Sequence, residues 1–512
     1  MDPVGQDTVI EFLGTADAYG GQSGAVRRID THGSIVFLYQ DRAFKMKRAV
    51  GFEYMDFSTL KRRRACCEAE VQINEAGAPG LYQRAVPVTQ QSDGGLAIGG
   101  NGTPVEWLVE MTRFDEATLF DRLAEDDTLT PELINAAAKV IAEYLDGAKI
   151  HREPGSSETL GDVVEESARM LAAGEGLVFD ATAIRRAVDG ARVEAERLSD
   201  FLDRRRQGGW VRRGHGDLHL RNIAVHNGVP ILFDAIEFND RLAIVDVLYD
   251  LAFLLMDLLP QGMPAAANRI LNGHLEHAGG YDSVAALPLF LASRAMIRAH
   301  VAVPAAKAQT DPIRAEQIRS DARKYLDLAI TFLAPPPPVL VAVGGLSGTG
   351  KSVQSRALAP ALGAPPGAVV LRSDIRRKSI MGVGPLDRLG PDGYTPDVTV
   401  AVYAGILQDA ELALSAGHAV ILDAVYARPT ERAAVNDLAQ RLDIPFTGIW
   451  LTGIQQTLLE RVAARTNDAS DADGAIVRAQ AEFDTGPMDW TEVEAEGSEH
   501  ETSANISALL GL

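Results

Sequence analysis

The stretch VLVAVGGLSGTGKSVQSRALAPAL at 339–362 constrains the fold more than any other part of the sequence. It opens with an apolar run rich in valine, which is typical of a buried strand, and the residues after Lys351 have the pattern of a helix. Gly345, Gly348 and Gly350 lie between the two, and glycine adopts backbone angles that other residues avoid. The sequence therefore predicts a strand, a tight loop and a helix in succession, within an α/β domain built on a parallel sheet.

The same loop fits the pattern GxxxxGK[ST]. In this pattern, backbone N–H groups at the helix N-terminus surround the phosphates of a nucleotide, the lysine neutralises the β- and γ-oxygens, and the hydroxyl ligates Mg²⁺. Lys351 is thus a candidate for both nucleotide binding and catalysis, and Ser352 is a candidate metal ligand. The predicted cofactors are ATP, with GTP left open, and Mg²⁺. The loop residues expected to bind the nucleotide are Gly345, Ser347, Gly348, Thr349, Gly350, Lys351 and Ser352.

Two further segments place an acid directly after an apolar run. Asp374 follows the run in AVVLRSDIRRKSI, and Asp423 ends the run in GHAVILDAVYARPTER. The carboxyl ends of parallel strands lie beside the bound ligand in an open α/β sheet. A carboxylate at the end of a buried strand is costly unless it is paired or used, so we expect a functional role for both.

From the 339–362 stretch onward, the chain resembles the small P-loop kinases related to polynucleotide kinase, gluconate kinase and zeta-toxin-like enzymes. The resemblance is carried by S-D-x-x-R and by the second apolar strand ending in Asp, which is followed by arginines. It implies that Asp374 is the base for an acceptor hydroxyl and that Arg377 contacts substrate or phosphate. It also implies that Asp423 acts on the metal or on water, with Arg428 and Arg432 nearby.

The segment LLERVAARTNDASDAD at 458–473 is similar to the lid of these kinases. The similarity implies that Arg461 and Arg465 close over the transferring phosphoryl group. The alternative is structural: residues four apart share a helix face, so the two arginines would then face solvent or pair with Glu460.

An earlier segment, GHGDLHLRN at 214–222, has a different phosphate-handling pattern. Four residues separate Asp217 from Asn222, and the apolar run ILFD ends in Asp234 shortly afterwards. This is the spacing of a kinase catalytic loop and of the metal-binding acid that follows it. The sequence therefore predicts a second phosphate site, far from the first along the chain.

A lysine that pairs with nucleotide phosphates is predicted in the strand AFKMKRAV at 43–50. Lys45 is the first candidate, and Lys47, on the same face of the strand, is the alternative. The partner acid is expected on the helix that follows, with Glu70 as the first choice and Glu68 as the second.

Together these residues resemble the aminoglycoside phosphotransferase family within the protein-kinase-like fold, whose loop reads H-G-D-h-x-x-x-N. The resemblance implies that Asp217 is the catalytic base, which orients the acceptor hydroxyl. It implies that Asn222 and Asp234 hold Mg²⁺ and that His215 supports the loop.

Three more features follow from this resemblance. The backbone around Glu110 and Met111 would contact adenine. Gly33 and Ser34 stand where kinases have their glycine-rich loop, and Asp250 in DVLYDLA is expected to be structural.

The composition limits the partners. The formal net charge is -21, with 70 acidic residues against 49 lysines and arginines, which disfavours nucleic acid because that affinity depends on basic residues releasing counterions. The most apolar run, VDVLYDLAFLLMDLLP at 245–260, is interrupted by aspartates and predicts a buried helix, not a membrane span. The two cysteines are adjacent at 66–67 and the N-terminus lacks signal-peptide features, so a cytoplasmic location is expected.

A chain of 512 residues is too long for one core, and PPPP at 335–338 marks the expected boundary because prolines do not continue a helix. We predict a protein-kinase-like phosphotransferase domain at 1–333, with a small lobe to about residue 115 and a helical lobe from about residue 116. A proline-rich linker at 334–338 and a P-loop kinase domain at 339–512 follow. The acidic stretch TEVEAEGSEHETSAN at 491–505 is expected to be loosely ordered.

The predicted fold class is therefore multidomain α/β: a bilobal, aminoglycoside phosphotransferase-like α+β domain, then a P-loop α/β domain with a parallel sheet. The same tandem resembles bacterial bifunctional aminoglycoside phosphotransferase/ATP-binding proteins. It implies an ATP- and Mg²⁺-dependent kinase with two nucleotide sites that phosphorylates a hydroxyl of a sugar, aminosugar or aminoglycoside-like molecule. Two alternatives remain: one unit is a non-catalytic nucleotide sensor that regulates the other, or the chain is a polynucleotide or protein kinase. No motif indicates the acceptor or the oligomeric state.

Overall fold

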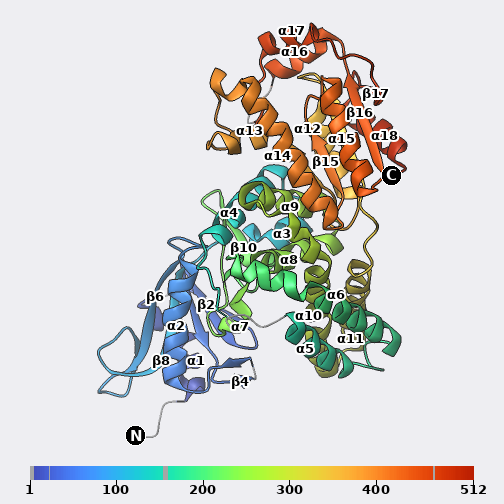
Figure 1. Ribbon diagram of the computed structural model, residues 1–512. Helices are drawn as coiled ribbons and strands as arrows, with labels where there is room; N and C mark the ends of the chain where they lie inside the picture. The colour runs from blue at the N-terminus through green and yellow to red at the C-terminus, as the bar shows by residue number, and fades with distance from the viewer. Residues whose placement is uncertain (1–4, 22–23, 53, 154–159, 465–467) are drawn as a thin grey trace. The chain divides into compact units, whose positions relative to one another are not determined.

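The computed structural model describes residues 5–21, 24–52, 54–153, 160–464 and 468–512. The chain divides into two compact units. Their helices and strands are labelled in Figure 1. Unit 1 comprises residues 1–162 and 199–257, and unit 2 comprises residues 163–198 and 258–512. The domain limits at 333 and 339 stay a prediction.

Unit 1 contains a six-stranded antiparallel sheet in the order β1-β2-β3-β8-β6-β7. Two clusters of apolar side chains pack on it, one with Val9 from helix α1 and Leu108, the other with Cys67 from helix α2 and Val109. Because Leu108 and Val109 are neighbours in one strand, the two clusters lie on opposite faces. The elements are α1 (Gln6–Leu13), β1 (Arg27–Asp30), β2 (Ser34–Tyr39), β3 (Arg42–Lys47), β4 (Gly51–Phe52), β5 (Met55–Asp56), α2 (Leu60–Asn74), β6 (Tyr82–Gln90), β7 (Leu96–Ile98) and β8 (Thr103–Thr112).

The remainder of unit 1 surrounds two short antiparallel pairs, β10 with β11 and β9 with β12. The apolar run at 245–260 forms helix α8, which is buried over nearly all its length, as expected. The elements here are α3 (Phe120–Glu125), α4 (Pro131–Gly147), β9 (Val211–Arg213), β10 (Ile223–His226), β11 (Val229–Leu232), α7 (Asp240–Ala243), β12 (Ile244–Asp246) and α8 (Val247–Leu258).

Unit 2 combines long helices with a second sheet. The helices before the sheet are α9 (Pro264–Ala278), α10 (Leu287–Ala308) and α11 (Pro312–Phe332), together with most of α5 (Leu160–Ala172) and residues 181–198 of α6 (Ala181–Gln207). In the described part of the chain, the segments Tyr281–Ala308 and Pro396–Ser415 are long and apolar enough to cross a membrane; inside the fold, 72% and 39% of their most apolar windows are buried.

The second sheet has five parallel strands in the order β14-β15-β13-β16-β17. Its strand β13, its loop and its helix α12 are the strand, loop and helix predicted from residues 339–362, and the predicted fold class is confirmed. The strands are β13 (Leu340–Gly345), β14 (Val369–Arg372), β15 (Val420–Asp423), β16 (Phe446–Thr452) and β17 (Thr491–Glu494). The helices are α12 (Lys351–Leu358), α13 (Ser373–Ile380), α14 (Pro396–Ser415), α15 (Pro429–Leu442), α16 (Gln455–Ala463), α17 (Gly474–Ala481) and α18 (Glu499–Leu510).

The acidic stretch at 491–505 is ordered, so the expectation of a loose tail was wrong. β17 pairs with β16 at the edge of the sheet, and Ser498 and Glu501 form a reciprocal capping box at the start of α18. Val493 and Ile506 are buried in the core of the sheet. A few well-placed apolar side chains and a good helix cap thus outweigh the acidic composition.

Candidate active sites

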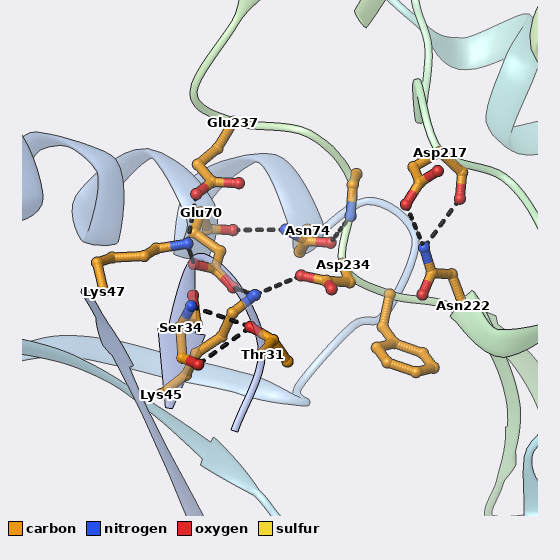
Figure 2. Close-up of polar contacts among 12 residues, drawn as sticks. Thr31, Ser34, Lys45, Lys47, Glu70, Asn74, Asp217, Asn222, Asp234 and Glu237 are labelled. Atoms are coloured by element: carbon orange, nitrogen blue, oxygen red, sulfur yellow. Dashed lines mark hydrogen bonds and ion pairs between the residues drawn. The ribbon is translucent and has the colours of Figure 1, made fainter. Parts of the chain in front are cut away.

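The first site is built around two lysines of strand β3 and one acid of helix α2 (Figure 2). Lys45 Nζ lies 2.8 Å from Glu70 Oε1 and also pairs with Asp234. Lys47 Nζ lies 2.5 Å from Glu70 Oε2 and also pairs with Glu237. The Glu70 side chain has no exposed surface, and Lys47 is 2% exposed. Both lysines considered from the sequence therefore bind the first-choice acid, whereas Glu68 pairs with Arg64 on the exposed side of the helix.

At Lys45 and Glu70, the charges of this cluster outweigh the effect of burial on the pKa. Burial alone lowers the pKa of Lys45, but the carboxylates of Asp234 and Glu70 hold that pKa well above its ordinary value. Burial alone raises the pKa of Glu70, but Lys45 and Lys47 hold it below its ordinary value. Burial is stronger at Glu237, whose pKa is raised despite Lys47. Lys45 is therefore a fixed positive charge whose neighbour Asp234 keeps 43% of its side chain exposed.

The loop at 214–222 brings Asp217 and Asn222 together. Asn222 Nδ2 donates to the Asp217 backbone oxygen at 2.9 Å and to Asp217 Oδ2 at 3.2 Å. The backbone N–H groups of His215 and Gly216 donate to Asp250, at 2.6 Å and 2.9 Å. Asp250 is thus a loop anchor, in keeping with the structural role expected for it.

Gly214 and His215 fix the start of this loop. A Cβ at Gly214 would lie 2.3 Å from Asp250 Oδ2, so the anchoring contact requires glycine there. His215 Nε2 lies 2.9 Å from the Phe233 backbone oxygen, and burial lowers its pKa, which favours the neutral ring. His215 thus links the loop to Phe233, the residue before Asp234. This contact agrees with the supporting role expected for His215.

Asp234 is held in a left-handed backbone conformation, with φ of 64°. Its N–H donates to the Tyr82 hydroxyl at 3.0 Å, and the next N–H, of Ala235, donates to Asn74 Oδ1 at 2.8 Å. Strand β6 and helix α2 therefore hold the turn that presents the carboxylate. Motif reasoning missed Tyr82, Asn74 and Glu237; the one signal for Glu237 is its position three residues after the motif acid.

Two predicted nucleotide contacts in unit 1 have other neighbours. Glu110 and Met111 lie inside β8, paired with β3 on one side and β6 on the other, and the Glu110 side chain binds Arg42 and Arg84. Their contact with adenine stays a prediction. At the turn before β2, Ser34 N donates to Thr31 Oγ1 at 3.0 Å, which makes a short closed turn.

The second site is the loop between β13 and α12. Gly345, Gly348 and Gly350 have φ of 140°, 93° and 89°, values in the region that favours glycine. A Cβ at Gly348 would lie 2.7 Å from the Leu458 backbone oxygen, so the loop also needs glycine for close packing. Lys351 Nζ donates to the Leu346 backbone oxygen at 3.0 Å.

A cavity of about 850 Å³ opens over this loop. Its wall contains the two predicted acids, the lysine and the serine hydroxyl of the P-loop, and three predicted arginines. The arginines come from α13, from the start of α15 and from α16. The predicted residues that line the cavity are Ser347, Gly348, Gly350, Lys351, Ser352, Asp374, Arg377, Asp423, Arg428 and Arg461. Arg465 lies outside the described residues. Arg432 is fully buried and donates to backbone oxygens of Tyr426 and Ala427, so its role is structural.

Of the two predicted acids in the cavity, Asp423 ends strand β15, and Asp374 lies in the first turn of α13, two residues after the end of the neighbouring strand β14. Burial raises the pKa of Asp374 above its ordinary value, opposed by the charge of Arg372 and reinforced by that of Asp423. Arg377 donates to the Gly393 backbone oxygen at 2.8 Å, which fixes its guanidinium at the cavity wall.

The Ser352 hydroxyl and the Asp423 carboxylate both contact the guanidinium of Arg372. Its Nη2 lies 3.1 Å from Ser352 Oγ and its Nε lies 3.3 Å from Asp423 Oδ2. Hydroxyl and carboxylate oxygens are the ligands that Mg²⁺ prefers, so this donor set fits the metal. Within the described residues no group of three or more His, Cys, Asp and Glu is placed to hold a metal, so hydroxyl, amide and phosphate oxygens would complete the shell at either site.

A family model described as "AAA domain" matches residues 340–485. A protein of Mycobacterium tuberculosis (strain ATCC 25618 / H37Rv), named only as uncharacterized, is 29% identical over 467 residues, covering 89% of this chain and 90% of the relative. Among solved structures, a choline/ethanolamine kinase family protein from Mesorhizobium loti is similar at 13% identity, covering 64% of this chain and 98% of that one, with a TM-score of 0.39. A gluconokinase from Sinorhizobium meliloti 1021 is similar at 21% identity over 34% of this chain and 96% of that one, with a TM-score of 0.24. The family model lies within the predicted P-loop domain. An antiparallel sheet in unit 1 and a parallel sheet in unit 2 follow one another along the chain in the order expected from the sequence.

Proposed function

We propose that the chain is an ATP- and Mg²⁺-dependent phosphotransferase with two nucleotide sites, whose acceptor is a hydroxyl of a sugar, aminosugar or aminoglycoside-like molecule. The observation that carries the proposal is the cavity of about 850 Å³ that gathers Lys351, Ser352, Asp374 and Asp423 around one space. Small-molecule sites are typically about 300–1,000 Å³, so this one has room for more than the phosphates of a nucleotide.

At the P-loop site, each residue has a separate task. Backbone N–H groups of the loop and Lys351 bind the phosphates. Asp374 accepts the proton of the acceptor hydroxyl while that oxygen bonds to the γ-phosphorus, and the bond from phosphorus to the bridging oxygen of ADP breaks. A raised pKa makes Asp374 a stronger base than an ordinary aspartate. Mg²⁺, held by Ser352 and Asp423, would supply neutralising charge to the phosphates.

In unit 1 the corresponding roles fall to other residues. Glu70 orients Lys45, whose charge faces the phosphates. Asp217 accepts the acceptor proton, and Asn222 and Asp234 would hold Mg²⁺. The hydrogen bond between Asn222 and Asp217 supports this assignment, because it joins the base to a metal ligand in one loop.

A second candidate is that unit 1 senses nucleotide without transferring phosphate. It is favoured by the Lys45–Asp234 ion pair, in which the phosphate lysine and the metal acid neutralise each other, and by the short closed turn at Thr31 and Ser34. In that case the P-loop site alone performs the transfer.

Acceptor-dependent ADP release separates these candidates. The panel holds sugars, aminosugars, aminoglycosides, nucleosides and a nucleic-acid 5′-hydroxyl end, tested with the unaltered chain, Asp217→Asn and Asp374→Asn. Asp93→Asn, at an exposed turn, is the control. Two transferases require each variant to lose activity on a different acceptor, by about 100-fold or more. Loss only with Asp374→Asn favours the sensor, and the absence of acceptor-dependent ADP release contradicts the proposal.

A further inference from the structure

Arg372 is the last residue of β14 and lies directly opposite Asp423, the last residue of β15. Its side chain is only 8% exposed, and the Asp423 side chain is 4% exposed. A buried guanidinium with carboxylates on two sides is a strong, directional set of contacts. Arg372 is therefore held in a defined position within this site. No sequence motif had predicted a role for it.

The contacts of Arg372 are with the groups that bind the metal under the proposed function. One guanidinium spans Ser352 Oγ, at 3.1 Å, and Asp423 Oδ2, at 3.3 Å. A divalent cation bound by the same two oxygens would lie within a few ångströms of this positive charge. The guanidinium and the metal ion therefore cannot bind these oxygens at the same time, because the two positive charges would repel each other strongly.

Asp468 gives the guanidinium a second anchor. Arg372 Nη2 lies 3.1 Å from Asp468 Oδ1, and the Asp468 side chain is 24% exposed, on the segment after helix α16. Asp468 also lines the cavity. Arg372 can thus release Ser352 and Asp423 and keep an ion pair with Asp468.

We propose that Arg372 is the internal counter-cation of the P-loop metal position: it occupies Ser352 and Asp423 until a divalent cation displaces it toward Asp468. The proposal rests on the proposed nucleotide site. It makes Arg372 a positioning residue, which keeps the metal-binding oxygens buried and paired when metal is absent and sets how much metal is needed to load the site.

Mn²⁺ binding, followed by the loss of the electron paramagnetic resonance signal of free Mn²⁺, tests this without any catalytic turnover. The full chain carries Asp234→Asn to weaken the proposed metal site of unit 1, and ADP is present. Arg372→Met is expected to raise Mn²⁺ affinity about tenfold, because a positive charge that competes for the same oxygens is gone. Arg356→Met is the matched control: Arg356 lies one helical turn beyond Ser352 and its charge acts on that of Arg372, so its removal tests the loss of nearby charge alone.

Unchanged or weaker Mn²⁺ binding in Arg372→Met overturns the proposal, and so does an equal gain in Arg356→Met. If Arg372→Met does not fold, Asp468→Asn decides, with Asp471→Asn as its control because Asp471 lines the same cavity but pairs with Lys378. Asp468→Asn is expected to weaken Mn²⁺ binding severalfold more than Asp471→Asn, and equal effects overturn the proposal. If the parent chain itself binds no Mn²⁺ with ADP, the proposed P-loop site fails as well, which is a different result from binding that Arg372 does not affect.

Discussion

At the scale of single residues, Asp374 combines a raised pKa with a place in the first turn of α13, at the wall of the cavity. Between the ordinary pKa of aspartate and the raised one, the folded chain holds a proton that the unfolded chain has released. Stability therefore falls as pH rises through this window, and at neutral pH the ionised carboxylate is a cost to folding. An activity that needs the ionised base is retained only above the raised pKa.

Asp374→Asn is expected to raise Tm at pH 7 by a few degrees and to lower activity at this site by about 100-fold or more. The Tm gain should shrink as the pH is lowered toward 4, because a growing share of the native carboxyl is then protonated. Thermal unfolding of both proteins at pH 4 and pH 7 measures it. Asp471→Asn is the control with the opposite sign, because Lys378 and Tyr394 outweigh burial and hold the pKa of Asp471 below its ordinary value. A lower Tm for Asp374→Asn at pH 7 would count against the raised pKa.

The Lys47–Glu237 pair gives a second prediction at this scale. Both side chains are almost completely buried, at 2% and 3% exposed, and Lys47 also forms an ion pair with Glu70. Lys47→Met leaves two buried carboxylates with one lysine fewer, so we expect a loss of about 3–5 kcal/mol in the free energy of unfolding. Lys47→Met with Glu237→Leu should recover much of that loss, as measured by urea unfolding. The idea is wrong if the double variant is as unstable as the sum of the two single ones.

At the scale of elements, helix α18 stabilises the helix that begins with Lys351 and Ser352. Gln354 of α12 donates to the Glu499 backbone oxygen at 3.0 Å, and Ser503 donates to Gln354 Oε1 at 2.6 Å. Ile506 has no exposed surface and belongs to the core of the sheet. The acidic end of the chain is therefore part of the P-loop scaffold.

Ile506→Ala is expected to lower the free energy of unfolding by about 2–5 kcal/mol, because it leaves a cavity under α12. Leu509, on the same helix but 50% exposed, is the matched site, and Leu509→Ala should change stability by less than about 0.5 kcal/mol. Denaturant unfolding monitored by the fluorescence of Trp450 and Trp490, which lie in this unit, reports both. Equal effects of the two substitutions would show that α18 does not belong to the core.

The elements differ in how far the sequence predicts them, for physical reasons. The strand, loop and helix at 339–362 are local, since apolar periodicity and glycine backbone freedom are properties of neighbouring residues. The contacts of Glu70 with Lys45 and Lys47 are long-range, but a known spacing of residue types pointed to them. Glu237 and Arg372 carry no such spacing, because their partners come from other elements. Order in the acidic stretch at 491–505 was missed because composition does not show that Val493, within the stretch, and Ile506, directly after it, are buried.

At the scale of the whole molecule, each candidate site is complete within one unit. Lys45, Glu70, Asp217 and Asp234 all belong to unit 1, and the residues that line the P-loop cavity all belong to unit 2. None of the residues named for one site belongs to the unit that contains the other. Under the proposed function, we therefore expect nucleotide binding at one site not to require the phosphate lysine of the other.

This separation predicts the stoichiometry of nucleotide binding. Titration calorimetry with a non-hydrolysable ATP analogue and Mg²⁺ should give two nucleotides per chain, since each unit supplies a lysine and oxygen ligands of its own. Lys45→Met and Lys351→Met should each leave one site, with affinity at the altered site reduced by about tenfold or more, because a charge that faces the phosphates is lost. Lys139→Met is the control, since that lysine is 75% exposed in an i,i+4 pair with Glu143 and should leave both sites intact. If either phosphate-lysine variant abolishes binding altogether, the two sites are one functional unit, and the assignment of a separate nucleotide to each is wrong.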